Sequence, residues 1–191
     1  MFMDALLSLD TSVFLFINHL PHFFFADIVA KFLSGIGEWG AVWFVIAVLL
    51  FIREEKKHHL FFLPFMLSGC ISVFVSEVIV KWIVARPRPF IEMGAIILEN
   101  PNNYSFPSTH ATLAWAMALV LASHEMRFRY LFYLLAICIS LSRIFLGVDY
   151  PLDFIGGSIL GIMIGWLSLM LNNYVQANLI HSLPKRSRKI R

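Results

Sequence analysis

The feature that most constrains this chain is a series of long apolar runs separated by short charged segments. The longest run extends from Leu60 to Ala85, and at about 1.5 Å per residue a helix of that length crosses a membrane with some tilt. Four further apolar runs cover residues 39–52, 108–123, 130–147 and 150–171. Only 14% of the residues are charged, against about 25% in an average soluble domain. We therefore predict an integral membrane protein that crosses the membrane five times between residues 39 and 171.

We expect one membrane domain that covers residues 1–191. Residues 1–36 mix apolar and polar side chains and contain no clean span, so we expect two helices that lie in the interface or re-enter the membrane. Residues 37–172 would form the transmembrane bundle, and residues 173–191 a basic cytoplasmic tail. The N-terminus has no pattern of a removable signal peptide.

The distribution of Lys and Arg predicts the orientation of the bundle. Following the five spans back and forth places residues 53–59, residues 124–129 and the C-terminal tail on one side, and these segments hold ten of the fifteen Lys and Arg residues. The positive-inside rule makes that side cytoplasmic. Residues 81–110 and 143–153 then meet on the periplasmic or extracellular side. The net charge of +3 is no nucleic-acid signal, because the cations lie in separate short loops.

The first of the stretches on that side contains Lys81 and Arg88. They follow the longest apolar run, where Pro87 and Pro89 end the helix. Lys supplies a point charge and Arg a planar fork, so the pair suits a phosphate group. Alternatively, both side chains snorkel to lipid headgroups. Arg86 suits a contact with lipid headgroups or with the loop better than a contact with the phosphate.

The second stretch is Pro107-Ser-Thr-His110, which opens an apolar run. Ser108 suits the N-cap of a helix, and the free N–H groups after a cap form an anion site. His110 would lie in the first turn, where it can protonate a leaving oxygen. The alternative is an ordinary capped helix with an incidental histidine.

The third stretch contains Arg143, Asp149 and Asp153. An Arg near the end of an apolar span needs an anionic partner, which can be a carboxylate or a phosphate. In the alternative interpretation, Asp149 caps the next helix and Asp153 pairs with Arg143. Because all three stretches meet on one side, we favour a shared phosphate site over three separate structural explanations.

These residues resemble the type 2 phosphatidic acid phosphatase superfamily, which includes bacterial undecaprenyl-diphosphate phosphatases and soluble vanadium haloperoxidases. Its three signatures are K-x6-R-P, P-S-G-H and S-R-x5-H-x3-D. The first signature matches fully, the second has Thr in place of Gly, and the third has Asp in place of His. The matching positions are Lys81 with Arg88-Pro89, Pro107-Ser108-Thr109-His110, and Ser142-Arg143 with Asp149 and Asp153.

The resemblance implies an all-α, polytopic membrane helical bundle of about six helices that hydrolyses a lipid phosphate without a metal or cofactor. The implied phosphate-binding residues are Lys81, Arg88, Ser108, Thr109 and Arg143. The implied catalytic positions are His110 as general acid, Asp149 in the place of the family's nucleophilic histidine, and Asp153, which orients that histidine in the family.

Asp149 is the main departure from the family. A carboxylate can accept a phosphoryl group as an acyl phosphate, but it is shorter than imidazole, and its charge repels phosphate. Three explanations follow: a natural variant that uses Asp149, a non-catalytic descendant, or a deliberate substitution. The phosphate pocket should be present in all three.

Two features support this interpretation less directly. Glu77 precedes Lys81 by one helical turn, which indicates either a local ion pair or a residue that positions Lys81. Gly157, Gly161 and Gly165 recur every four residues, which predicts close helix packing within the monomer.

We predict a lipid phosphate or diphosphate phosphatase of the plasma (inner) membrane that acts at the outer leaflet. Undecaprenyl diphosphate is the first expected substrate and a phosphatidic acid-like lipid the second, with membrane lipids and no nucleic acid as partners. The alternative is a membrane protein of the same fold that binds a phosphate lipid without hydrolysis. A transporter is disfavoured, because Glu77 is the clearest ionisable residue within a span.

Overall fold

The structure, a computed structural model, describes residues 2–53, 61–89 and 95–182. Within these residues the chain is all-helical and forms six helical segments, so the predicted fold class is confirmed. The segments, with their bounds, are α1 (Phe2–Asn18); α2 (Phe24–Gly37), η1 (Glu38–Gly40) and α3 (Ala41–Arg53); α4 (Phe62–Val73), η3 (Phe74–Val80) and α5 (Lys81–Val84); α7 (Thr109–His124); η4 (Met126–Phe128) and α8 (Arg129–Phe145); and α9 (Pro151–Ser182).

Four of these segments are long and apolar enough to cross a membrane. They are Phe24–Arg53, Phe62–Val84, Met126–Phe145 and Pro151–Asn178. Many of their apolar side chains are exposed on the outside of the bundle, as expected for a surface that faces lipid. The chain is therefore a multi-pass membrane protein.

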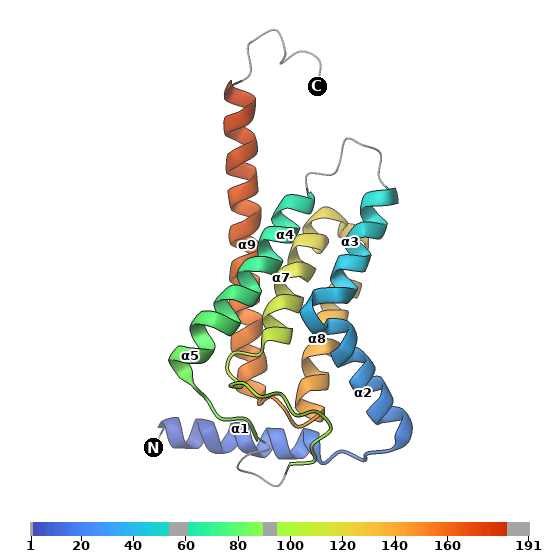
Figure 1. Ribbon diagram of the computed structural model, residues 1–191, viewed down its shortest axis with the longest axis vertical. Coiled ribbons are helices and arrows are strands. Elements are labelled where there is room, and N and C mark those ends of the chain that lie inside the picture. The colour runs from blue at the N-terminus through green and yellow to red at the C-terminus, as the bar shows by residue number, and fades with distance from the viewer. Residues whose placement is uncertain (1, 54–60, 90–94, 183–191) are drawn as a thin grey trace.

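Helix α7 lies in the middle of the bundle (Figure 1) and packs against α9, α8 and α4. Its 16 residues are buried on all sides along most of their length, which is what a helix that is apolar all round requires. The central position of α7 matters for function, because its N-terminus carries Ser108, Thr109 and His110.

The glycines of α9 allow this helix to lie directly against α7. A Cβ atom at Gly157 would come within 2.6 Å of the Ser108 carbonyl oxygen, and one at Gly165 within 2.8 Å of the Ala116 carbonyl oxygen. At Gly161 the Cβ atom would overlap the carbonyl of Thr112. The predicted close packing within the monomer is confirmed.

The N-terminal region differs from the expectation in its second half. Helix α1 lies across one end of the bundle (Figure 1), whereas α2 continues into α3 as one candidate span. The expected boundary at residue 36 therefore falls inside this span. The span bends at η1, where Trp39 has a φ of 51° and Gly40 a φ of 76°. Towards the C-terminus, α9 remains helical to Ser182, so the expected tail begins as helix, and residues 183–191 lie outside the described part of the chain.

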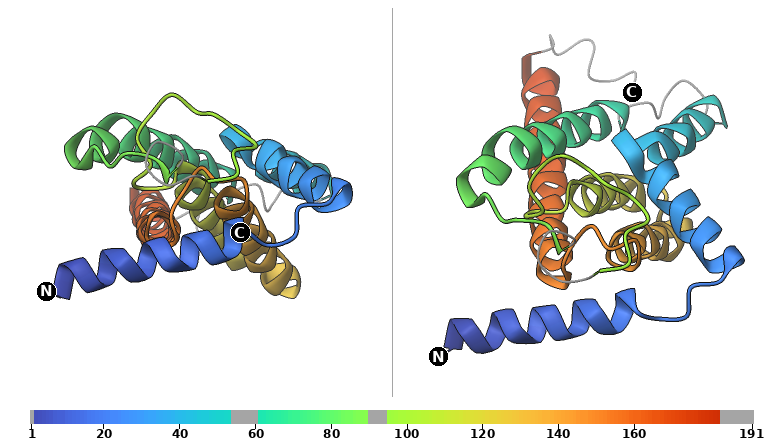
Figure 2. Two further views of the ribbon diagram at one scale, coloured as in Figure 1. Left: turned by 90° about the horizontal axis from the view of Figure 1, so that it is seen from below. Right: turned by 60° about the horizontal axis from the view of Figure 1, so that its bottom comes forward.

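The connections that carry the three signatures meet at the end of the bundle near α1. Figure 2 shows the segment after α5, the segment before α7 and the α8–α9 connection close together there. The end of α3, the start of α8 and the end of α9 lie at the opposite end (Figure 1).

Candidate active site

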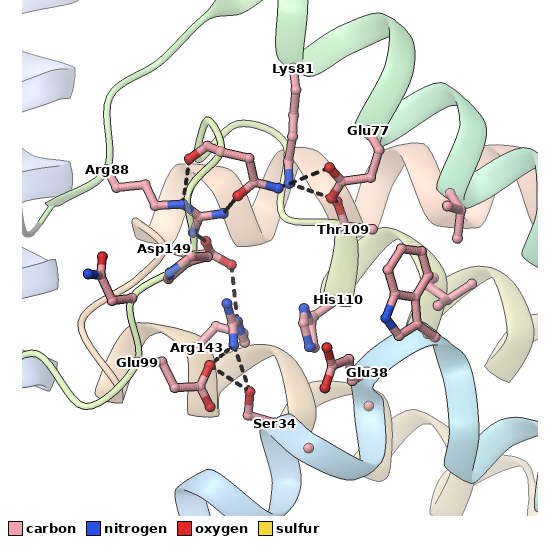
Figure 3. A pocket seen from close by; sticks show the side chains of 18 residues that line it. Ser34, Glu38, Glu77, Lys81, Arg88, Glu99, Thr109, His110, Arg143 and Asp149 are labelled. Atoms are coloured by element: carbon pink, nitrogen blue, oxygen red, sulfur yellow. Dashed lines mark hydrogen bonds and ion pairs between the residues drawn. The ribbon is translucent and has the colours of Figure 1, made fainter.

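A cavity of about 360 Å³ lies at this end, between α2, the α4–α5 segment, α7 and α8 (Figure 3). Many of its wall residues carry polar or charged side chains, and these come from all three signatures and from three places outside them. The polar and charged wall residues are Ser34, Glu38, Glu77, Lys81, Arg88, Glu99, Asn100, Asn103, Thr109, His110, Arg143 and Asp149.

Lys81 begins α5, directly after the π-helical turn η3. Its side chain is 4% exposed, and its Nζ atom lies 2.6 Å from Glu77 Oε1. The helix ends four residues later, where Ala85 adopts the left-handed conformation and donates its N–H to the Lys81 carbonyl. This cap turns the chain so that the following arginines face back towards the bundle.

Arg88 is the most fully hydrogen-bonded cation of the cavity. Its Nη1 atom lies 2.6 Å from Asp149 Oδ1 and 2.7 Å from the Val148 carbonyl oxygen. Its Nε and Nη2 atoms donate to the backbone and side-chain oxygens of Asn103, at 2.8 Å and 2.5 Å. With the Tyr104 carbonyl at 3.2 Å from Nη2, backbone and side-chain oxygens of four residues fix the guanidinium plane before any ligand binds.

Ser108 is the N-cap of α7, as predicted, and accepts a hydrogen bond from the Ala111 N–H at 3.4 Å. Its hydroxyl also donates to Asp149 Oδ2 at 2.7 Å. Ser108 therefore lies behind Asp149, while Thr109 and His110 reach the cavity wall. The His110 ring lies beside Gly37, where a Cβ atom would be 3.4 Å from its Cδ2 atom.

Arg143 enters the cavity from the last turn of α8. Its Nη1 atom donates to Ser34 Oγ at 2.6 Å and to Glu99 Oε2. The Nε atom is buried without a hydrogen-bond partner in the described residues, at 3.7 Å from Asp149 Oδ2. A buried N–H without an acceptor is unusual in folded proteins, and this one belongs to a residue of the cavity wall.

Asp149 is 2% exposed and lies between Arg88, Ser108 and Arg143. Burial alone would raise the pKa of its carboxyl group, but the guanidinium groups of Arg88 and Arg143 lower that pKa to about 2. Asp149 is therefore ionised at neutral pH, and its oxygens contact the groups that the sequence analysis assigns to a bound phosphate.

Asp153 lies outside the cavity wall, and its partners differ from those considered in the sequence analysis. Its Oδ1 atom pairs with Arg86 Nη1 at 2.8 Å, and its Oδ2 atom accepts the Tyr150 N–H at 2.8 Å. The alternative pairing of Asp153 with Arg143 is wrong, because Glu99 and Asp149 are the carboxylates that lie beside Arg143. Arg86 is not a cavity residue and also pairs with Asp10 of α1 at 2.5 Å.

Sequence reasoning did not identify Ser34, Glu38, Glu99 and Asn103 as cavity residues. Glu99 and Asn103 lie in an irregular segment, where spacing carries no information on side-chain direction. Ser34 belongs to the region that was expected at the interface, and Glu38 lies just after its expected boundary at residue 36. The only available signal was the need of Arg143 for an anionic partner, which Glu99 supplies.

Comparisons with known proteins identify relatives of this chain. The PAP2 superfamily profile matches residues 61–177. An undecaprenyl-diphosphatase of Sulfolobus acidocaldarius is 31% identical over 146 residues, which are 74% of this chain and 68% of that protein. The crystal structure of Aquifex aeolicus LpxE superposes with a TM-score of 0.68 at 29% identity, over 83% of this chain and 93% of that one.

A second solved structure supports the fold alone. It is a transmembrane PAP2-type phosphatidylglycerolphosphate phosphatase from Bacillus subtilis, with a TM-score of 0.67 and 20% identity over 90% of this chain and 88% of that one. The profile match covers more than half of the chain and includes all three signatures. The chain belongs to the PAP2 superfamily, the type 2 phosphatidic acid phosphatases.

Proposed function

We propose that this protein is a membrane phosphatase that removes a phosphate from a lipid phosphate or diphosphate. The observation that carries the proposal is the convergence of Lys81, Arg88 and Arg143 with His110 on one cavity. Ammonium and guanidinium groups from three separate segments suit the oxygens of one phosphate, although without a ligand each pairs with a carboxylate of the chain: Glu77, Asp149 and Glu99. The unpartnered Nε atom of Arg143 leaves a donor available for a phosphate oxygen.

An apolar groove beside the cavity supports a lipid as the substrate. The groove has a volume of about 620 Å³ and lies between α3, α4, η3 and α7. Trp39, Val73 and Leu113 line both the groove and the cavity. A ligand with its phosphate on the three cations therefore has an apolar path for its tail directly next to its headgroup.

In this proposal Lys81, Arg88 and Arg143 bind the phosphate oxygens, with Ser108 and the start of α7 behind them. Once the negative charge of a bound phosphate favours the protonated His110 ring, His110 donates that proton to the lipid oxygen as its bond to phosphorus breaks. Asp149 stands where the family has its nucleophile. Attack by an Asp149 oxygen would form an acyl phosphate, which water would then hydrolyse to phosphate and the free carboxylate.

We place this site at the outer leaflet of the plasma membrane, with a polyprenyl diphosphate as the first candidate substrate. The orientation is supported by the distribution of Lys and Arg along the sequence. The substrate class is supported by the undecaprenyl-diphosphatase that resembles this chain. A single membrane domain of residues 1–191 carries the whole site.

One observation favours the second candidate function, a phosphate-lipid-binding protein without turnover. Both oxygens of Asp149 already accept hydrogen bonds, from Arg88 and from Ser108. Asp153, which orients the nucleophile in the family, is held by Arg86 and the Tyr150 N–H. An attacking carboxylate would first have to leave these partners.

The test is phosphate release from a panel of lipids, with the wild-type chain and Asp149→His compared side by side. The panel contains a polyprenyl diphosphate, a polyprenyl monophosphate and phosphatidic acid. Turnover by the wild type identifies an enzyme that uses Asp149, and turnover by Asp149→His alone identifies an inactivated site. If both proteins bind these lipids but release no phosphate, the binding function replaces the enzymatic one.

A further inference from the structure

The carboxylate of Glu77 accepts hydrogen bonds from three different segments of the chain. Lys81 Nζ and Thr109 Oγ1 donate to its Oε1 atom at 2.6 Å and 2.5 Å (Figure 3). Asn103 Nδ2 donates to its Oε2 atom at 3.0 Å. An ion pair with Lys81 alone would explain only the first of these contacts.

Asn103 extends this network to the second cation of the first signature. Its side-chain oxygen accepts from Arg88 Nη2 at 2.5 Å, and its backbone oxygen accepts from Arg88 Nε at 2.8 Å. Glu77 and Asn103 thus form a hydrogen-bonded chain from the ammonium group of Lys81 to the guanidinium group of Arg88. Fixing these two residues fixes the distance between the two cations.

The local backbone is adapted to this arrangement. Glu77 lies in the π-helical turn η3, which interrupts an otherwise α-helical span just before Lys81. Such turns are uncommon and occur often at functional sites. Thr109 stands where the second signature has glycine, and its hydroxyl supplies the contact from α7. A glycine could not make that contact.

We propose that Glu77 is a positioning residue that, through Asn103 and Thr109, holds Lys81 and Arg88 at the separation that a phosphate group requires. The inference rests on the proposed function, because it names a part of the same phosphate site. It differs from a simple charge-neutralising role, in which Glu77 would compete with phosphate for Lys81. The two roles predict opposite changes when the contacts to Glu77 are removed without a change of charge.

The test uses Asn103→Leu and Thr109→Val, which are close in shape, neutral, and each remove one hydrogen bond to Glu77. The probe is orthovanadate, and its binding to the full chain in phosphate-free detergent is measured by vanadium NMR. We expect each variant to bind about tenfold more weakly, the lower end of the loss seen when hydrogen bonds that orient metal ligands are removed. Asn103→Leu also removes the contact of the Asn103 side chain with Arg88. The double variant should still lose less than the product of the two, because both variants remove a hydrogen bond to Glu77.

Two controls separate positioning from a general structural effect. Thr109→Ser keeps the hydroxyl group and should restore wild-type affinity. Asn102→Leu changes the exposed neighbouring side chain and should leave affinity unchanged. Unchanged or tighter binding in Asn103→Leu and Thr109→Val would overturn the positioning role while leaving the phosphate site intact. A wild-type chain that does not bind vanadate at all would overturn both the phosphate site and this inference.

Discussion

At the scale of single residues, Asp149 decides what the cavity can do. Its carboxylate lies 2.6 Å from Arg88 and 2.7 Å from Ser108, and 3.7 Å from the otherwise unpartnered Nε atom of Arg143. A phosphate oxygen would seek the same three partners. Asp149 therefore acts as an internal anion that partly occupies the site in the absence of a ligand, and any bound phosphate has to tolerate its charge or displace it.

Replacing Asp149→Asn should strengthen anion binding. The amide keeps the shape of the side chain and removes the negative charge; its oxygen can still accept from Arg88, whereas its NH2 group would have to donate to Ser108 Oγ and so reverse that hydrogen bond. Two like charges about 4 Å apart repel by roughly 1 kcal/mol in water and roughly 4 kcal/mol near a protein surface. We therefore expect vanadate or phosphate to bind at least about fivefold more tightly. Isothermal titration of both proteins measures the change. Equal or weaker binding would show that Asp149 does not occupy the anion site.

The same carboxylate predicts how stability depends on pH. The pKa of Asp149 is about 2 in the folded protein and about 3.9 in an unfolded chain. Its stabilising contribution is therefore complete above the unfolded value and is lost as pH falls through the folded value. A shift of this size corresponds to about 2–3 kcal/mol.

Unfolding of the wild type and Asp149→Asn in detergent, measured between pH 6 and pH 2, checks this prediction. The wild type should lose stability faster than the variant as the pH falls below about 4. Parallel loss in the two proteins would contradict the low pKa of Asp149.

Single residues were predictable from the sequence where a signature or a cap defined them. Ser108 as an N-cap and Arg86 as a residue outside the cavity were identified from local chemistry. Glu99 and Asn103 were not, because their directions depend on how an irregular segment folds over Arg143 and Arg88. The spacing of residues in the sequence does not predict such contacts.

At the scale of helices, apolar runs identified α3, α4–α5, α7, α8 and α9, whereas the joining of α2 and α3 into one span was not predicted. The hydropathy of α2 is interrupted by Asp27 and Lys31, which suggested a helix at the interface. In the structure the Asp27 carboxylate is hydrogen-bonded to His22, whose Nδ1 atom lies 2.8 Å from its Oδ1 atom. A contact with a nearby residue can thus accommodate a polar side chain that the hydropathy pattern counts as a break.

Replacing glycine with alanine should change stability in opposite directions at two positions, one in the contact between α7 and α9 and one in α2. Gly161→Ala should destabilise the protein by about 1–3 kcal/mol, the usual cost of overpacking, because the new methyl group would overlap the Thr112 carbonyl. Gly35→Ala places the same group where no atom lies within 4 Å. Since alanine is favoured over glycine in a helix by about 0.5–1 kcal/mol, this variant should be neutral or more stable.

Thermal unfolding in detergent, followed by circular dichroism, measures both glycine variants. If Gly161→Ala unfolds at the same temperature as the wild type, α9 does not lie against α7 as closely as described.

At the scale of the whole molecule, the two ends of the bundle differ in chemistry. One end carries the cavity, α1 and the connections with the three signatures (Figure 2). Asp10 of α1 is joined to this end through Arg86 and the Leu152 N–H. An interfacial position of α1 would therefore hold the cavity at the level of the lipid headgroups, where a lipid phosphate presents its charged group.

The orientation of these ends can be tested by labelling single cysteines. In a background with Cys70→Ser and Cys138→Ser, Asn102→Cys marks the cavity end and Arg127→Cys the opposite end; both positions are exposed. Because most Lys and Arg residues of the sequence fall in segments assigned to the end opposite the cavity, a membrane-impermeant maleimide should label Asn102→Cys in intact bacterial cells. It should label Arg127→Cys only after the cells are opened. The reverse pattern would place the cavity at the cytoplasmic leaflet, and the substrate would then have to be a lipid phosphate of that leaflet.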